Sequence, residues 1–247
     1  MTWRAPTHTI ESLTNGTAYV FRVRAKGAGS TTGDAVGTWA VTPGTSIPAL
    51  DFDSNDNNLI EITTLAQLDA VRYDLDGDSV PSGTTADRGA YYAAFRTSLA
   101  GSFCDACAGY ELMNDLDFDT DGSGTTWTGT ESNPTGDSAD AYNNSGKGWI
   151  PLGDYAATFD GNRYTIDNLF VNRGASDNGN AGLFKTIAAT GIVRNLELTN
   201  VLTRSQNVTY GNAGGIASVN SGTIQTSSVE GDSLAGERRY RLRQDLT

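Results

Sequence analysis

The sequence predicts an all-β protein whose main part is a right-handed parallel β-helix, a solenoid of stacked coils. Two observations lead to this fold class. The 247 residues include 29 glycines and long runs of Asn, Asp, Ser and Thr, and such turn residues favour many short strands over helices. A pattern of aliphatic residues also recurs about every thirty positions, a period typical of solenoids.

The N-terminal residues predict two strands. Apolar side chains alternate with mostly charged ones over 19–26, the pattern of a half-buried antiparallel strand, and 36–41 supplies a second strand. The order of turn, alternating aromatics and final Thr42-Pro43 resembles the end of a fibronectin type III domain. The resemblance implies that 1–45 is the C-terminal part of such a β-sandwich, with Tyr19 as its tyrosine-corner residue.

Three aspartate-rich loops follow, at 51–62, 74–79 and 115–124. Alternating carboxylates place hard oxygen ligands on one side of a tight loop, which suits calcium. The candidate calcium ligands are Asp117, Asp119 and Asp121, and in the first loop Asp51, Asp53 and Asn55. Neither loop is an EF-hand, because the twelfth position of the third loop is Thr128 and Glu61 comes one place early in the first. Plain solvated turns are the alternative.

Between the first two loops, residues 63–75 predict one short amphipathic helix. Its leucines and valine recur at helical spacing, and Thr63 or Thr64 can cap it. A helix placed before a repetitive β region is suited to cover an open edge.

The two cysteines, Cys104 and Cys107, form a C-x-x-C pair, which can be a redox centre, half of a zinc site or a tight disulfide. Zinc would need two more thiolate or imidazole ligands, and the chain has one histidine, His8. A thioredoxin-like centre needs a βαβ context that this segment lacks. We favour a structural disulfide; free buried thiols, or redox or metal chemistry, are the alternatives.

Three stretches of the C-terminal half can be laid over one another, each with two aliphatic residues five places apart. The pairs are Ile166 with Val171, Val193 with Leu198, and Ile224 with Val229. Their first members lie 27 and 31 residues apart, and glycine-led segments at 180–184 and 212–217 precede the later two. In a parallel β-helix, inward aliphatics form a continuous core and small residues form the corners. We therefore predict coils over 151–231.

The last coil carries "GGI" followed by "N-x-G-x-I". The residues are Gly214, Gly215, Ile216, Asn220, Gly222 and Ile224. This pattern resembles the GLUG-motif repeats of large bacterial surface and secreted proteins, and the resemblance extends over about residues 50–231. It implies that 46–150 is an Asp-rich lead-in containing the capping helix and the cysteine pair. Residues 226–228 depart from the pattern, where an Asn and more apolar side chains are expected.

After Gly231 the repeat stops, and 238–243 contains four arginines in six residues. We expect 232–247 to be a disordered or out-of-pattern tail, with anion binding as an alternative. A start within a sandwich and an end within a solenoid predict that the chain is a piece of a longer protein. No segment has the pattern of a transmembrane helix or a signal peptide, so a secretion signal is expected outside this chain.

The charge and the histidine count restrict the function. The formal net charge of -12 repels phosphates, so nucleic acid is not an expected partner. A Ser-His-Asp triad within the coils and an H-E-x-x-H zinc site are excluded by the single histidine. Only a chance meeting of Asp167 with Lys185 or Arg194 would favour a β-helical polysaccharide-degrading enzyme.

The GLUG resemblance implies instead a non-catalytic module of an extracellular or bacterial cell-surface protein. Such a module would be adhesion-like or structural, with glycans or cell-surface proteins as partners and a pure spacer as the alternative. Trp127 and Tyr142 are the candidate sugar-stacking residues, whereas core packing is the better use of Trp149.

Overall fold

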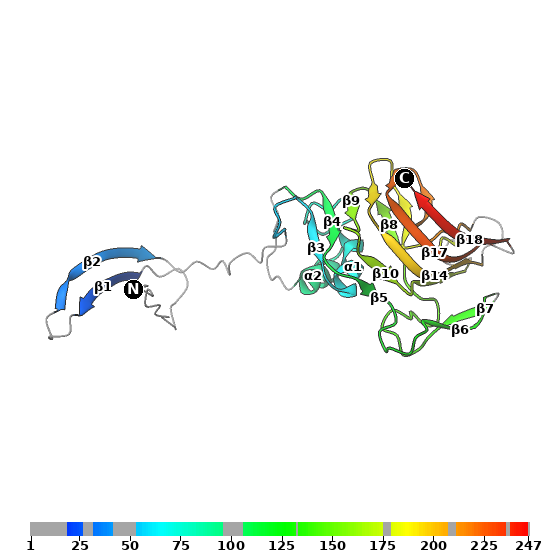
Figure 1. Ribbon diagram of the computed structural model, residues 1–247, viewed down its shortest axis with the longest axis horizontal. Coiled ribbons are helices and arrows are strands. Elements are labelled where there is room, and N and C mark those ends of the chain that lie inside the picture. Colours follow the sequence, from blue (N-terminus) through cyan, green and yellow to red (C-terminus); the bar gives the residue numbers. More distant parts are fainter. Residues whose placement is uncertain are drawn as a thin grey trace. The chain divides into compact units, whose positions relative to one another are not determined.

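Figure 1 shows the computed structural model of the chain. The structure describes residues 19–26, 32–41, 53–95, 106–131, 133–174, 179–206, 211–235 and 238–246. The chain divides into two units, Met1–Asp51 and Phe52–Thr247. Strands far outnumber helices in the described ranges, so the molecule is of the all-β class that the composition predicts.

The described residues of the first unit form one antiparallel hairpin. Strand β1 (Tyr19–Lys26) covers the predicted range and pairs with β2 (Thr32–Val41), which begins earlier than expected. Phe21 lies opposite Trp39 in this hairpin. The rest of 1–45, including the other parts of the fibronectin type III resemblance, lies outside the described residues.

The second unit is built from short strands that the chain visits in a repeating order. Their bounds are β3 Ile60–Ile62, β4 Gly109–Leu112, β5 Leu116–Asp117, β8 Leu152–Tyr155, β9 Thr158–Asp160, β10 Thr165–Asp167, β11 Phe170–Arg173, β12 Phe184–Ile187, β13 Ile192–Arg194, β14 Glu197–Ser205, β15 Ala217–Asn220, β16 Thr223–Gln225, β17 Ser227–Ala235 and β18 Arg238–Leu246.

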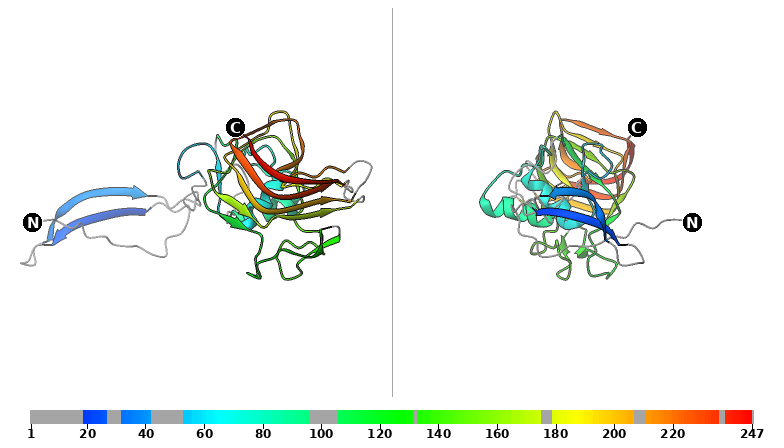
Figure 2. Two further views of the ribbon diagram at one scale, coloured as in Figure 1. Left: turned by 45° about the vertical axis from the view of Figure 1, so that its right-hand side comes forward. Right: turned by 90° about the vertical axis from the view of Figure 1, so that its left-hand side faces the viewer.

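These strands form three mainly parallel sheets, seen from two further sides in Figure 2. One has the order β15-β12-β8, and another β16-β13-β9-β4-β3. The last has β18-β17-β14-β10-β5, with β11 also paired to β14. The passes β12–β14 and β15–β17 thus each add one strand to every sheet.

Successive passes are in register, and their inward side chains form rows. The rows are Tyr110, Phe159, Val193 and Ile224; Leu116, Ile166, Leu198 and Val229; and Leu152, Phe184 and Ala217. All are buried except the outermost Ile224 and Ala217, and the buried ones belong to one hydrophobic cluster. Full burial of such a side chain contributes about 1.5–3 kcal/mol, so the rows hold the three sheets together.

The structure corrects the predicted overlay of the first stretch. The alignment of Val193 with Ile224, and of Leu198 with Val229, is confirmed. Ile166, however, lies opposite Leu198, and Val193 lies opposite Phe159. The predicted overlay placed Ile166 with Val193, although Ile166 belongs to the following strand, β10. The error arose because the corner at 161–164 is longer than the equivalent corner at 195–196. Seven positions separate Phe159 from Ile166, but five separate Val193 from Leu198.

The corner between the second and third sheets uses a left-handed residue. Asn195 has φ 51° and Thr226 has φ 48°, and both directly follow the paired residues Arg194 and Gln225. Asparagine tolerates this conformation, whereas a β-branched side chain is strained there. Thr226 is therefore a locally unfavourable residue at a corner whose backbone geometry is the same in both passes.

We expect Thr226→Asn to raise the free energy of unfolding by about 0.5–1 kcal/mol, because it relieves this strain. Thermal unfolding followed by circular dichroism measures the change. The reciprocal Asn195→Thr should lower stability, since it also removes the hydrogen bond from the Asn195 side chain to Asp160. Unchanged melting temperatures in both variants would contradict the role of the corner.

The predicted helix is present, and its cap is decided by the structure. Helix α1 (Leu65–Ala70) continues into the 3-10 turn η1 (Val71–Tyr73). The Thr64 hydroxyl accepts from the Gln67 amide, and the Gln67 side chain accepts from the Thr64 amide. This capping box selects Thr64 over Thr63 as the N-cap residue.

A second helix, α2 (Thr85–Ala94), was not predicted. One face of this segment packs into the core through Tyr91 and Phe95, which are buried. A local signal was present, because Thr84 and Asp87 form a second capping box.

The C-terminal segment decides between two expectations. Residues 232–235 complete β17, and residues 238–246 form β18, which pairs antiparallel with β17 along its whole length. These described residues are ordered strands, and of the two alternatives they fit the out-of-pattern segment. The parallel repeat does end here, because β18 reverses direction and lies at the edge of its sheet (Figure 1).

Candidate metal-binding loops

Residues 118–149, here called the excursion, connect β5 to β8 outside the three sheets. They contain an antiparallel hairpin of β6 (Trp127–Thr130) and β7 (Asn133–Gly136). The hairpin is tied back to the sheets by the side-chain amide of Asn172, which donates to the carbonyl of Pro134 at 2.9 Å. This excursion holds the best candidate site of the molecule.

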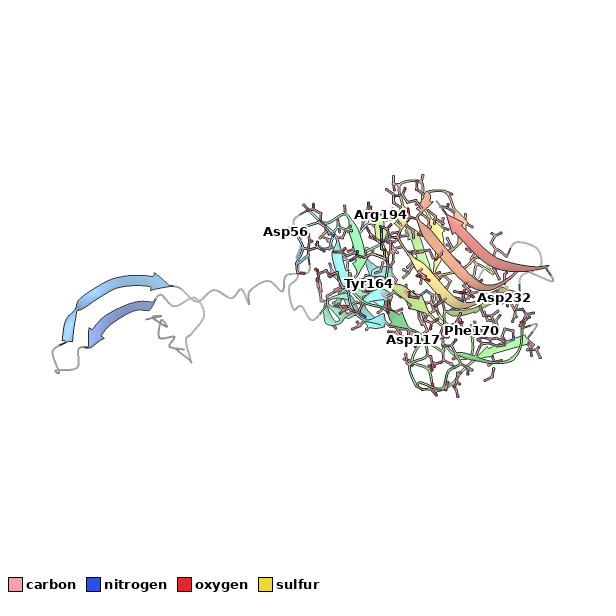
Figure 3. All side chains as sticks on the ribbon, in the orientation of Figure 1. Asp56, Asp117, Tyr164, Phe170, Arg194 and Asp232 are labelled. Carbon is pink, nitrogen blue, oxygen red and sulfur yellow. The ribbon has the colours of Figure 1, made fainter. Side chains whose placement is uncertain are left out.

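The third acidic loop brings Asp119 and Asp121 together with Asp140 from the far limb of the excursion. One carboxylate oxygen of each residue lies within 4.8 Å of those of the other two. Asp117, which sequence analysis grouped with this loop, is not a member of the cluster. It is the last residue of β5 and is labelled in Figure 3. Its Oδ1 accepts from the side-chain amide of Asn168 at 2.9 Å. Asp140 carried no motif signal, because it is distant in sequence from the loop.

Asp140 is 7% exposed. Its Oδ1 accepts from the Thr120 amide at 2.7 Å and from the Thr120 hydroxyl at 3.2 Å. Its Oδ2 is buried and has no hydrogen-bond partner among the described residues. Burial raises the pKa of Asp140, the hydrogen bonds from Thr120 and from the backbone of Asp121 oppose that rise, and the charge of the Asp121 carboxylate adds to it. A buried carboxylate oxygen without a partner is costly.

The other two carboxylates accept hydrogen bonds from backbone amides of their own loop. The Ser123 amide donates to Asp119 Oδ1 at 3.0 Å and to Asp121 Oδ1 at 2.9 Å, and the Gly124 amide donates to Asp119 Oδ2 at 2.6 Å. The backbone hydrogen bond from Ser123 is the main cause that lowers the pKa of Asp121. Asp121 therefore stays ionised, and it is the exposed member of the cluster.

A second acidic cluster is made by Asp74, Asp76 and Asp78, whose carboxylate oxygens also lie within 4.8 Å of one another. Asp74 is buried, and it accepts hydrogen bonds from the hydroxyls of Tyr110 at 2.6 Å and Tyr91 at 2.9 Å and from two backbone amides. Burial raises the pKa of Asp74 to about 6, the two tyrosine hydrogen bonds oppose the rise, and Asp76 and Asp78 add to it. The protein itself thus satisfies the buried member of this cluster.

The first acidic loop offers no comparable set among its described residues. Asp51 lies outside them. Asp53 accepts from the backbone amide of Asn57 at 2.8 Å, while the Asn55 side chain donates to Glu111 Oε1 at 2.6 Å. The predicted ligands Asp53 and Asn55 therefore serve to fold the loop and to tie it to β4.

Cys107 is disulfide-bonded and nearly buried beside the start of β4. The chain contains two cysteines, and Cys104 lies outside the described residues. A free thiol at Cys107 is thereby excluded.

The two candidate sugar-stacking residues lie in different environments. Tyr142 packs internally, with its ring 5.8 Å from that of Phe118 and 5.7 Å from that of Trp149. Trp149 is buried and its indole donates to the Leu183 carbonyl, so its core role is confirmed. Trp127 is half-buried and stacks near Phe170, with ring centroids 6.5 Å apart and an interplanar angle of 20°.

Trp127 lines an open groove of about 570 Å³ between the excursion and the third sheet. Its other polar walls include Asn168, Asn200 and Asp232, the last of which is labelled with Phe170 in Figure 3. Aromatic surface beside amide and carboxylate groups is a composition that suits a sugar.

The pairing that would have favoured catalysis is not formed. Lys185 lies 3.7 Å from Asp154, and Arg194 lies 2.7 Å from Asp160. Asp167 instead accepts from the Thr199 hydroxyl at 2.6 Å and from neighbouring amides. Lys185, Arg194 and Asp167 therefore each contact a side chain of an adjacent strand.

Comparison with known proteins finds two partial matches among curated sequences. A segment of 58 residues is 47% identical to a protein named as a Gly-rich membrane protein of Evansella cellulosilytica, covering 22% of this chain and 6% of that protein. A segment of 102 residues is 33% identical to halomucin of Haloquadratum walsbyi, covering 38% of this chain and 1% of halomucin. This chain thus spans a small fraction of each relative. No family model and no solved structure matches.

Within the described residues, no helix combines the length and apolar character needed to cross a membrane.

Proposed function

We propose that the chain is a non-catalytic module of a large cell-surface or secreted protein, as its resemblance to the GLUG repeats of bacterial surface proteins implies. The observation that supports this most is the in-register stacking of Tyr110, Phe159 and Val193 along one sheet and of Leu116, Ile166 and Leu198 along another. Stacked passes of this kind build an elongated, repetitive body. The relatives, one of them named a membrane protein, are compatible with a location outside the cell.

The three sheets are proposed to be the faces of a right-handed parallel β-helix. Crossover connections between parallel strands are right-handed in nearly all proteins, and the last two parallel passes, β12–β14 and β15–β17, each add one strand to each sheet. A pass would lengthen the body by about 4.8 Å, the spacing of adjacent strands. Repetition of the unit would therefore give a surface protein reach, with most backbone groups hydrogen-bonded and protected.

We propose calcium as the cofactor of this module. The acidic clusters offer only oxygen ligands, which calcium prefers and which zinc and copper sites rarely use alone.

We also propose that the groove beside Trp127 binds glycans. The apolar face of a sugar can stack on the exposed part of the indole, while Asn168, Asn200 and Asp232 are placed along the groove to meet hydroxyl groups. Tyr142, the other candidate, is a packing residue away from this groove and is not part of the proposed site.

A glycan array probed with the whole chain tests this site. We expect Trp127→Ala to weaken any detected binding about tenfold or more, because the loss of a stacking aromatic commonly costs over 1 kcal/mol. Tyr142→Phe is the matched control, since it keeps the ring and leaves the groove unchanged. Equal binding by wild type and Trp127→Ala would contradict the groove, and an array without any signal would favour the spacer role instead.

A further inference from the structure

We propose that Asp119, Asp121 and Asp140 form a calcium site that joins the two limbs of the excursion. The proposal deepens the assignment of calcium to this module, because it names a site that the loop sequence alone does not contain. Asp119 and Asp121 lie before the β6–β7 hairpin, and Asp140 lies after it. An ion held by all three would close the excursion at its base.

The spacing of the three carboxylates fits the ion. Calcium binds six to eight oxygen atoms at about 2.3–2.6 Å, so two ligands on opposite sides of it are about 4.8 Å apart. The candidate oxygens all lie within 4.8 Å of one another, so a single cation can contact all three carboxylates.

The second observation is the unpartnered oxygen of Asp140. Asp140 is 7% exposed, and its buried Oδ2 has no hydrogen-bond partner among the described residues. The other oxygen is held by Thr120, which fixes the orientation of the carboxylate. A cation is the group that would satisfy Oδ2, because the neighbouring side chains of Asp119 and Asp121 are acceptors too.

Electrostatics favours the same conclusion. Three carboxylates within this distance repel one another, and none of the ion pairs between described residues includes Asp119, Asp121 or Asp140. Bound calcium would turn this repulsion into attraction. The Asp74 cluster has no comparable unpartnered oxygen at its buried member, since both oxygens of Asp74 already accept hydrogen bonds from the protein.

The site also explains why the two limbs lie together. Thr120 donates to Asp140 through its amide, and its hydroxyl accepts from the Ala141 amide at 2.8 Å. Calcium would strengthen this same junction. Residues 124–129, which form one wall of the groove, begin three positions after Asp121, so the ion would also steady that wall.

Calcium titration of the chelator-treated whole chain tests the site, with isothermal calorimetry and thermal unfolding as readouts. At about one hundred times Kd, calcium should raise the melting temperature of the second unit by about 5–10 °C. Asp121→Asn and Asp140→Asn should weaken binding about tenfold or more and abolish that rise. Asp121 is exposed and its substitution leaves packing unchanged, so it keeps the test interpretable if Asp140→Asn folds poorly.

Asp78→Asn is the matched control, because it removes one exposed carboxylate from the other cluster. It should keep the full response to calcium. A response that survives in both Asp121→Asn and Asp140→Asn but is lost in Asp78→Asn would overturn this site while leaving calcium as the cofactor. No response in the wild-type chain would overturn both.

Discussion

Phe159→Ala is expected to lower the free energy of unfolding of the second unit by about 3–5 kcal/mol. Phe159 is fully buried, and it stands in the row between Tyr110 and Val193. Its ring also meets those of Tyr155 and Phe184 edge to face, with centroids 6.2 and 5.4 Å away. Truncation leaves a cavity where two of the sheets contribute side chains, and a rigid ladder of strands cannot collapse to fill it.

The measurement is chemical denaturation of the whole chain, with the fall in melting temperature, about 10 °C or more, as a second readout. Ile150→Ala provides the control, because Ile150 is 50% exposed and its truncation should change stability by less than about 0.5 kcal/mol. Similar losses in the two variants would show that the row of stacked side chains is not the core of the module.

Acidification is expected to stabilise the fold through Asp74. Burial raises its pKa from 3.8 to about 6, so the folded state binds the proton more tightly than the unfolded state. The sign follows from linkage: this contribution is full below pH 3.8 and is lost as pH rises through 6. A shift of this size corresponds to about 2–3 kcal/mol of stability between pH 7 and pH 4.

Asp74→Asn isolates that contribution, since other carboxylates also titrate in this range. In the presence of chelator, the stability of wild type relative to Asp74→Asn should increase as pH falls from 7 to 4. For Asp87 the trend is reversed: the stability of wild type relative to Asp87→Asn should decrease as pH falls, because hydrogen bonds from Thr84 lower the pKa of Asp87. If the stability of wild type and of Asp74→Asn changed with pH in the same way, the raised pKa of Asp74 would be refuted.

Local signals predicted much of the secondary structure. The alternation over 19–26 gave β1 with its bounds, and the apolar spacing of 63–75 gave α1 and η1. The repeat aligned Val193 with Ile224 correctly, because both passes have corners of the same length. The earlier pass was misaligned since extra residues in a corner change the sequence period without changing the stacking.

Sequence analysis identified two of the three residues of the candidate site. Asp119 and Asp121 stand in a recognisable acidic loop, but Asp140 joins them through the course of the excursion around the β6–β7 hairpin. Asp117 has the same spacing as its neighbours, yet it belongs to the end of β5, and there its side chain bonds to Asn168 on an adjacent pass. Spacing along a loop does not report which side of a strand end a carboxylate faces.

The sequence by itself determined the class of the protein, because strand alternation, turn composition and helix caps are short-range properties of neighbouring residues. Only the tertiary structure decided which passes stack, that β18 pairs with β17 and becomes the edge strand of its sheet, and that Asp140 completes the acidic cluster. These features depend on contacts between residues far apart in the chain. Their free energy comes from burial and from the field of charges brought together by folding, and no local pattern encodes it.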